Sequence, residues 1–308
     1  MNSGIDVLDG RIVRLARMVA LSPRSSLRLV KTRRIARHFP AYLRRRAVAR
    51  DLTNCSQWAG FIPRGQGYRM LSADSLAGSK DAIETCGKLF AAKGGITAFM
   101  AGKKPFFTNI LEYEDLVVNP EILNFVLSDA VVESVTAYLG TVPRLNSLGL
   151  FVSDANESLE SSQLFHLDGE DFHMMKCFYN LDHVESKNGP FTFLSSATTD
   201  RVREGLKTDL GSGRIKDDDV YRFCAPGDAI RLTGGAGTGA FVDTANCLHF
   251  GSRARAGHRI VLMFCYSPHP NIKISKGKSD LPGMPVQDFP LEPYADDPLR
   301  RMLLGVDA

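Results

Sequence analysis

The sequence predicts a mainly β core with flanking helices. From Arg144 onward, short runs rich in Val, Ile, Phe and Leu are bounded by Gly, Pro, Asn and Asp, which is typical of strands joined by turns. Between Asp51 and about Gly140, apolar residues instead recur at helical spacing. The 308 residues are 44% hydrophobic and 23% charged, a composition that indicates a folded globular protein and excludes disordered, collagen-like and coiled-coil classes.

Eight strands are expected in the second half of the chain. They comprise residues 145–152, 163–168, 174–181, 191–194, 220–224, 229–232, 240–243 and 260–266. Because no helical pattern lies between them, a sandwich, a barrel or a jelly roll is indicated, and about eight strands fit a two-sheet jelly roll best. Two helices are expected earlier, over residues 79–93 and 119–139, the second with another capping signal near Ser128-Asp129.

The first 50 residues are strongly basic. They hold 13 Lys and Arg against Asp6 and Asp9, a net charge of +11, so the remaining chain carries −7. We interpret them as a helical extension whose apolar stripe packs on the body, the stripe being Leu8, Ile12, Leu15 and Val19. The alternatives are an arm for an anionic membrane, a nucleic acid or an acidic protein partner, or an Arg-rich transit peptide.

The chain divides into four predicted segments. They are a basic helical extension (1–50), a helical support segment (51–140), the β core (141–275) and a tail packing on the core (276–308). No uncharged apolar run reaches the roughly 18 residues of a transmembrane helix, and no secretory signal is visible. Because no secretory signal is visible, a cytoplasmic location is expected. The six cysteines have neither a CxxC pair nor the density of a disulfide framework, so reduced thiols are expected.

His166 and Asp168 form the most informative motif. They are two residues apart in an expected strand, so their side chains project from the same face, opposite Phe165 and Leu167. An imidazole nitrogen and a carboxylate oxygen suit a divalent iron or manganese ion. Taken alone, such a pair is more often a surface hydrogen bond. The polar residues that follow either reach a substrate or form an ordinary strand edge; they are Glu170, Asp171, His173 and Lys176.

Other histidines compete for the metal role. His183 and Glu185 have the same spacing but lie in a turn-like stretch, where the same-face argument fails. His249, His258 and His269 are the candidates for a third ligand, and His249 is the best placed because it follows an expected strand.

Arg259 opens the apolar strand that follows. Its same-face neighbours are Val261, Met263 and Cys265, so an unpaired guanidinium would be costly to bury there. Either it binds a carboxylate with its planar fork, or it lies at the exposed mouth of the strand.

Together these residues resemble the iron(II)- and 2-oxoglutarate-dependent oxygenases, specifically the phytanoyl-CoA dioxygenase-like branch. The resemblance covers about residues 140–268 and implies a double-stranded β-helix, a cupin-like jelly roll. It is carried by His166-x-Asp168, Asn188-Gly189-Pro190, Gly227-Asp228, His249-x-Gly251-Ser252 and Arg259, ten residues after His249. The chain departs from the family at residues 191–198, where a Pro-Gly-Ser-His stretch is usual.

The resemblance also implies roles for single residues. His166, Asp168 and His249 would hold Fe(II), while Arg259, supported by Ser252, would bind the distal carboxylate of the co-substrate 2-oxoglutarate. With O2, such a site hydroxylates a C–H bond of a small molecule and releases succinate and CO2. Halogenating relatives replace the carboxylate ligand with a small residue, so Asp168 favours hydroxylation.

Two other functions stay open. One is a non-catalytic jelly-roll binding protein that its basic arm recruits to an acidic partner. The other is a nucleobase-modifying enzyme with a nucleic-acid handle, which the single tryptophan and the lack of interleaved basic and aromatic residues in the core disfavour.

Overall fold

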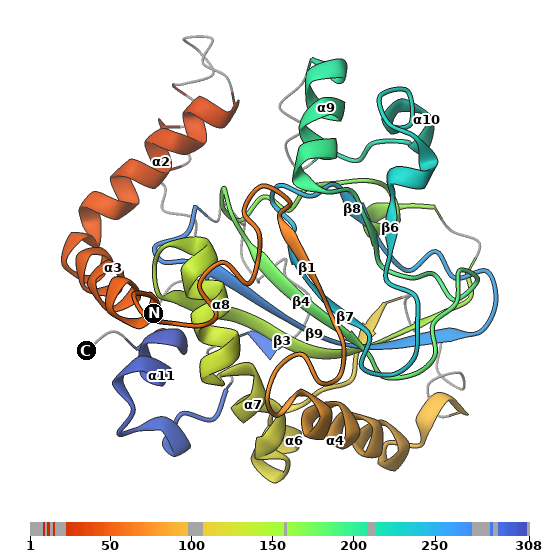
Figure 1. The fold of residues 1–308 in the computed structure, drawn as a ribbon, viewed down its shortest axis with the longest axis horizontal. Coiled ribbons are helices and arrows are strands. Elements are labelled where there is room, and N and C mark those ends of the chain that lie inside the picture. The colour runs from red at the N-terminus through yellow and green to blue at the C-terminus, as the bar shows by residue number, and fades with distance from the viewer. Residues whose placement is uncertain are drawn as a thin grey trace.

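Two antiparallel sheets form the centre of the molecule (Figure 1). The computed structural model describes residues 9, 11–12, 15, 23–97, 107–156, 159–207, 213–272, 284–285 and 289–306. The larger sheet has the order β1 (Tyr68–Leu71), β7 (Gly239–Asp243), β4 (Met175–Asn180), β9 (His258–Pro268), β3 (Pro143–Asp154), β10 (Met284–Pro285), with β2 (Thr108–Asn109) also paired to β3. The smaller sheet has the order β6 (Ile230–Arg231), β5 (Thr192–Phe193), β8 (His249–Phe250).

Side-chain alternation gives each sheet two buried faces. On β9, Leu262 and Phe264 point to one face of the larger sheet, whereas Val261 and Met263 point to the other. The second pair shares an apolar cluster with Phe193 of β5 in the smaller sheet. The two sheets therefore pack face to face, with this cluster between them.

Helices cover the outer faces of both sheets. Those on the larger sheet are α4 (Ser79–Ala92), α6 (Tyr113–Val118), α7 (Pro120–Val126), α8 (Asp129–Leu139) and α11 (Pro298–Leu303). Beside the smaller sheet lie α9 (Ser196–Leu206) and α10 (Asp217–Val220), which contribute Val202 and Val220 to a third apolar cluster (Figure 1). Short 3-10 turns occur at Ser161–Gln163, Pro226–Asp228 and Glu292–Tyr294.

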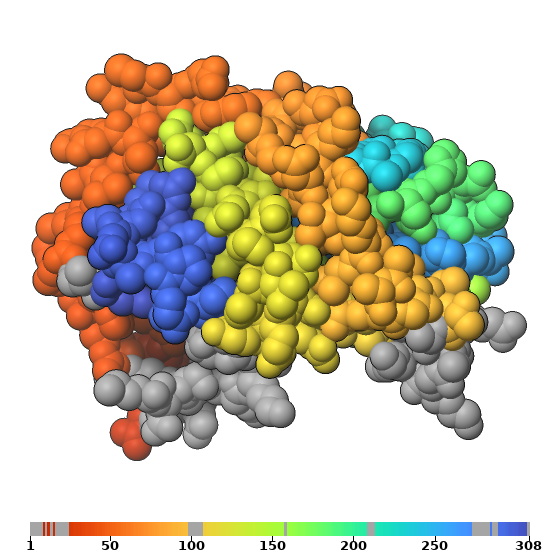
Figure 2. All heavy atoms as spheres, turned by 90° about the horizontal axis from the view of Figure 1, so that it is seen from below, coloured from red at the N-terminus to blue at the C-terminus, as the bar shows by residue number. Residues whose placement is uncertain are grey.

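The N-terminal helices contact the body through cationic side chains. On α3 (Phe39–Thr53), the fully buried Arg45 donates to the carbonyl oxygens of Val142 (3.1 Å), Pro143 (3.0 Å) and Met302 (2.5 Å). These contacts join α3 to the start of β3 and to α11. Viewed from below, the N-terminal helices, the C-terminal segment and α6–α8 lie side by side (Figure 2).

The preceding helix, α2 (Pro23–Arg37), reaches the loop after Asp168. Lys31 Nζ lies 2.5 Å from Asp171 Oδ2 and 2.7 Å from the carbonyl oxygen of Pro270. Of the predicted apolar stripe, Ile12 is half-buried and Leu15 is 62% exposed, whereas Leu8 and Val19 lie outside the described residues. Leu15 therefore does not pack on the body as predicted.

Most predicted elements form, with differences at their ends. Residues 145–152, 174–181, 191–194, 229–232, 240–243 and 260–266 overlap β3, β4, β5, β6, β7 and β9, and residues 79–93 overlap α4. Residues 119–139 split into α7 and α8 at Ser128, where the second capping signal lies. The division into four segments stays a prediction, although β10 of the predicted tail pairs with β3.

Two predicted strands are wrong. In residues 220–224, Val220 ends α10, whose first turn holds three aspartates that favour a helix N-terminus. Residues 163–168 form no regular strand, because only the isolated bridges Phe165–Ile215 and His166–His249 pair them. Strand β1 and helix α9 were not predicted; α9 begins after Ser195, whose Oγ accepts a hydrogen bond from the Thr198 N–H.

The stretch Pro120–Leu139 is long and apolar enough to pass for a membrane span by composition. However, 67% of its most apolar 18-residue window is buried inside the fold. The helices α7 and α8 supply core residues such as Val131 and Val135. Their packing on the larger sheet accounts for their apolar composition.

The turn at Gly189 packs closely against Arg253 and Ala254, in the loop that follows β8. Gly189 has φ +68°, and a Cβ there would lie 2.4 Å from the Ala254 nitrogen and 2.7 Å from the Arg253 carbonyl carbon. We therefore expect Gly189→Ala to lower the free energy of unfolding by more than about 1 kcal/mol, measured by urea denaturation. Gly60→Ala is the matched control, because Gly60 has φ +81° but open space around it. Equal losses in both variants would contradict a packing role for Gly189.

Candidate metal centre and its cavity

The structure brings together His166, Asp168 and His249. Each offers one ligand atom, and the three atoms lie within 4.8 Å of one another. His166 Nε2 is 4.0 Å from Asp168 Oδ1, and His249 Nε2 is 3.7 Å from Asp168 Oδ2. Two imidazoles and one carboxylate on one side of an ion leave further coordination positions open, an arrangement suited to non-heme Fe(II).

Backbone pairing sets the position of the ligands. The N–H of His166 donates to the carbonyl of His249 (3.0 Å), and the N–H of His249 donates to the carbonyl of His166 (3.1 Å). The N–H of Asp168 donates to the carbonyl of Thr244 (2.9 Å). Phe165 and Leu167 point into the apolar cluster beside α9, so the predicted alternation holds although no regular strand forms.

The tautomer of each histidine favours metal binding. His166 Nδ1 is 2.8 Å from the carbonyl oxygen of Leu164, and His249 Nδ1 is 2.9 Å from that of Cys247. Because a carbonyl only accepts hydrogen bonds, each Nδ1 carries the proton. The lone pair of each Nε2 is then free to face Asp168 and an ion beside it.

Burial keeps both imidazoles neutral. It lowers the pKa of His249 to about 3, with the neighbouring His166 adding to the effect, and it also lowers the pKa of His166. Burial alone would raise the pKa of Asp168, but Lys176 and the two histidines more than offset this, so the net pKa is lowered. At neutral pH the three groups therefore carry the protonation states that metal binding requires.

The ligands line a cavity of about 250 Å³ between the two sheets. One wall is apolar and consists of Phe107, Phe178, Phe191, Val261 and Met263. The polar groups besides the ligands are Ser161, Ser162, Lys176, Arg214, Ser252 and Arg259. The volume is below the roughly 300–1,000 Å³ of pockets for drug-sized ligands, so the cavity suits a small co-substrate.

Arg259 presents an open guanidinium fork to this cavity. The side chain is buried; Nη2 donates to Ser252 Oγ at 3.3 Å, whereas Nε and Nη1 have no hydrogen-bond partner in the described part of the chain. Burial lowers the pKa of Arg259 to about 10, against an opposing effect of Asp182, so the group stays charged at neutral pH. A buried cation with two unused donors is a site for an anion.

Ser252 is fixed beside Arg259. Its Oγ lies 3.0 Å from Ser153 Oγ, within hydrogen-bond distance, and its carbonyl oxygen accepts from Gln163 Nε2 at 2.9 Å. Its φ is +59°. The structure thus places the two residues predicted to bind one carboxylate next to each other.

Lys176 is a charged residue in contact with the ligand Asp168. It is buried on β4, and its Nζ lies 2.8 Å from Asp168 Oδ2. Burial disfavours its charge, but Asp168 outweighs this and raises the pKa of Lys176. Sequence reasoning placed Lys176 only in a polar cluster, because its contact with Asp168 depends on the pairing of distant strands.

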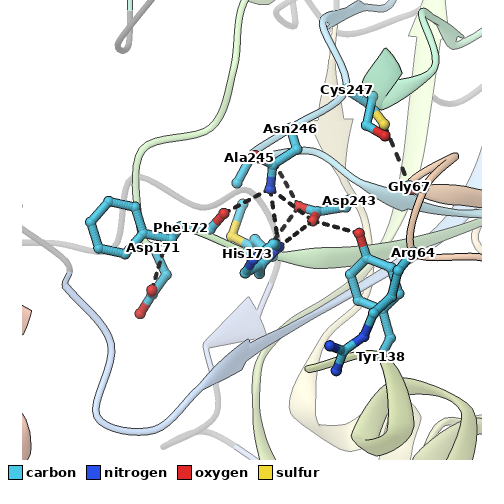
Figure 3. Close-up of polar contacts among 12 residues, drawn as sticks. Arg64, Gly67, Tyr138, Asp171, Phe172, His173, Asp243, Ala245, Asn246 and Cys247 are labelled. Carbon is cyan, nitrogen blue, oxygen red and sulfur yellow. Dashed lines mark hydrogen bonds and ion pairs between the residues drawn. The ribbon is translucent and has the colours of Figure 1, made fainter. Parts of the chain in front are cut away.

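The neighbours of Lys176 in that predicted cluster have other roles. Asp171 pairs with Lys31, and His173 Nδ1 lies 2.8 Å from Asp243 Oδ2. The buried Asp243 also accepts hydrogen bonds from Tyr138 Oη (2.8 Å) and Asn246 Nδ2 (2.9 Å), as Figure 3 shows. This network fixes the end of β7 directly before Thr244, the residue that binds the backbone of Asp168.

The rival histidines lie elsewhere. His183 is exposed, with Nε2 3.9 Å from Glu185 Oε1. His258 Nε2 lies 3.3 Å from Asp182 Oδ2, and the ring of His269 contacts His38. None of the three lines the cavity.

No protein-family model and no curated protein sequence matches the chain. Among solved structures, it is similar to the non-heme alpha-ketoglutarate-dependent carbocyclase SnoK from nogalamycin biosynthesis, with 16% identity over 76% of this chain and 94% of that chain and a TM-score of 0.48. It is also similar to HygX from Streptomyces hygroscopicus with nickel and 2-oxoglutarate bound (14%, 75% and 94%, TM-score 0.44). A third is the epimerase SnoN in complex with Fe3+, alpha ketoglutarate and nogalamycin RO (16%, 77% and 91%, TM-score 0.43). Identities and TM-scores this low do not show a shared substrate or reaction.

Acid is expected to destabilise the metal-free protein through its buried histidines. The pKa of His249 falls from 6.5 to about 3 on folding, so between these pH values the unfolded chain binds a proton that the native chain lacks. This contribution to stability is complete above about pH 6.5 and is lost as the pH falls towards 3, by up to about 1.4 kcal/mol per pH unit.

Urea unfolding of the metal-free protein from about pH 7 to pH 4 measures this slope. We expect His249→Gln to lose less stability per pH unit than the wild type. The exposed His183 supplies the control, since His183→Gln should keep the wild-type slope. A wild-type slope in His249→Gln would contradict the prediction.

Proposed function

We propose that the protein is an Fe(II)- and 2-oxoglutarate-dependent dioxygenase that acts on a small molecule. The observation that carries the proposal is the content of one cavity. It holds both the His166–Asp168–His249 group and the open guanidinium of Arg259. A metal-binding group and a carboxylate-binding group facing the same small space fit a co-substrate that has an oxo-acid end and a distal carboxylate.

The fold supports this assignment. Two antiparallel sheets face each other, and the ligands lie where the segment after the first 3-10 turn pairs with β8. We propose that these sheets are the two walls of a double-stranded β-helix, with residues 1–50 as an extension outside it. The motifs also favour the phytanoyl-CoA dioxygenase-like branch.

Each residue of the cavity has a proposed task. His166, Asp168 and His249 would hold Fe(II), which, with 2-oxoglutarate and O2, supplies the oxidising chemistry and yields succinate and CO2. Arg259 and Ser252 would hold the distal carboxylate, and the apolar wall would limit the access of water to the cavity. Asp168 supplies a carboxylate at the position that halogenating enzymes leave to a halide, so hydroxylation of an unactivated C–H bond is favoured.

The binding-protein alternative stays a prediction, as do a cytoplasmic location and an anionic or protein partner for residues 1–50. A non-catalytic protein would not need two neutral imidazoles, one ionised carboxylate and an arginine with unused donors in the same cavity. The buried donors of Arg259 therefore weigh in favour of the enzyme.

The metal role predicts the behaviour of Asp168→Ala. This variant removes the only acidic group that lines the described cavity, so we expect loss of Fe(II)-dependent succinate release and weaker Co2+ binding in calorimetry. Glu185→Ala is the control, because Glu185 is half exposed and does not line the cavity. Unchanged turnover in Asp168→Ala would remove the assignment.

The co-substrate role predicts a graded effect at Arg259. Removing one partner of a buried charge pair costs about 2–5 kcal/mol, so Arg259→Ala should raise the Kd for 2-oxoglutarate at least about tenfold. Arg259→Lys keeps the charge but loses the fork, so its effect should be smaller, and metal affinity should change little in both variants.

Calorimetry on metal-loaded protein measures the Kd for 2-oxoglutarate in the wild type and in both variants. Arg231→Ala is the control, since Arg231 is exposed on β6. The mechanism would fail if the wild type bound no 2-oxoglutarate, or if Arg259→Ala bound it as tightly as the wild type.

A further inference from the structure

Lys176 occupies an unusual position for a lysine. The side chain is only 8% exposed, and its Nζ lies 2.8 Å from Asp168 Oδ2. Its neighbours Met175 and Cys177 face the opposite side of β4, where they join the helical core. Strand alternation therefore directs Lys176 into the cavity, together with Phe178.

Lys176 and Arg259 enter the cavity from backbone positions that lie far apart in the sheet. In the sheet, Lys176 pairs with Cys265 of β9, six positions beyond Arg259 on the same strand. At about 3.4 Å per residue, the two backbone positions are roughly 20 Å apart. Lys176 and Arg259 therefore do not form one joint binding site for a single carboxylate. Lys176 lies beside the metal ligand Asp168.

A lysine beside Asp168 cannot serve to attract a metal ion to the ligands. A cation beside a divalent ion opposes its binding, and an apolar side chain of similar length would fill the same space. Asp168 is the one acidic residue that lines the described cavity, and its effect on the ammonium exceeds that of Glu170, so the ammonium acts mainly on the carboxylate of Asp168. Through its ion pair with Oδ2, it competes with a metal for one of the two oxygens that a carboxylate can offer.

We propose that Lys176 is a positioning residue that limits Asp168 to one coordinating oxygen. This inference rests on the proposed function. A second oxygen from Asp168 would fill a coordination position that the oxo-acid end of 2-oxoglutarate needs. Lys176 thus keeps that position open, at the cost of a weaker attraction for the metal.

The test uses the full-length protein loaded with Co2+, whose absorption spectrum reports coordination. In the absence of 2-oxoglutarate, Lys176→Met should change this spectrum, and Lys176→Arg should largely restore it. Lys176→Met should also raise the Kd for 2-oxoglutarate and slow succinate release, each by about tenfold or more. Its affinity for Co2+ should not weaken.

The matched control is Lys187→Met. Lys187 forms an equally close ion pair, 2.7 Å from Glu185 Oε2, but it is 60% exposed and lies outside the cavity. It should leave the spectrum and the 2-oxoglutarate affinity unchanged. Circular dichroism checks folding, and Lys176→Gln serves the same comparison if the methionine variant does not fold.

Two results would overturn the inference. One is a wild-type Co2+ spectrum in Lys176→Met, which would show that the lysine does not act on coordination. The other is an equal change in Lys176→Met and Lys176→Arg, which would indicate packing and not charge. A wild type that binds no Co2+ would instead overturn the proposed function itself, so the two failures are distinguishable.

Discussion

The reciprocal hydrogen bonds between the backbones of His166 and His249 are the contact on which the site depends. They bind the segment after the first 3-10 turn to the edge of the smaller sheet, at 3.0 and 3.1 Å. A shift of this pairing by one residue would turn both imidazoles to the opposite face, because side chains alternate along extended backbone. The packing of Phe165 in the cluster beside α9 opposes such a shift.

Burial then determines the chemistry of the assembled groups. The removal from water that keeps the two histidines neutral also lowers the pKa of Arg259, but only to about 10, so its guanidinium stays charged at neutral pH, with donors that have no partner among the described residues. The neutral imidazoles, together with Asp168, favour the binding of a metal ion, and the charged guanidinium favours the binding of an anion. The protein accepts the cost of these buried polar groups because larger apolar clusters stabilise both sheets.

Sequence patterns predicted the site better than its surroundings. The spacing of His166 and Asp168 and the placement of His249 and Arg259 beside apolar runs sufficed to select residues that line one cavity. Local pattern failed where tertiary contacts decide the structure. Residues 163–168 lack a regular partner strand, and the apolar residue Val220 closes a short helix instead of starting a strand.

Two further features depend on contacts that no local pattern records. The pairing of Lys176 with Asp168 requires β4 to lie beside the segment of the first ligands, and the hydrogen bonds of Asp243 require α8 to reach the end of β7. From the sequence, Asp243 was predicted only as the last residue of the strand 240–243. Its hydrogen bonds with Tyr138 and His173 became visible only in three dimensions.

A crystal structure of the protein with Fe(II) and 2-oxoglutarate, grown without oxygen, tests the central claim most directly. Our account predicts one ion bound by His166 Nε2, Asp168 and His249 Nε2 at about 2.0–2.3 Å, with the distal carboxylate of 2-oxoglutarate on Arg259. An ion bound elsewhere, or a co-substrate that does not contact Arg259, would contradict it.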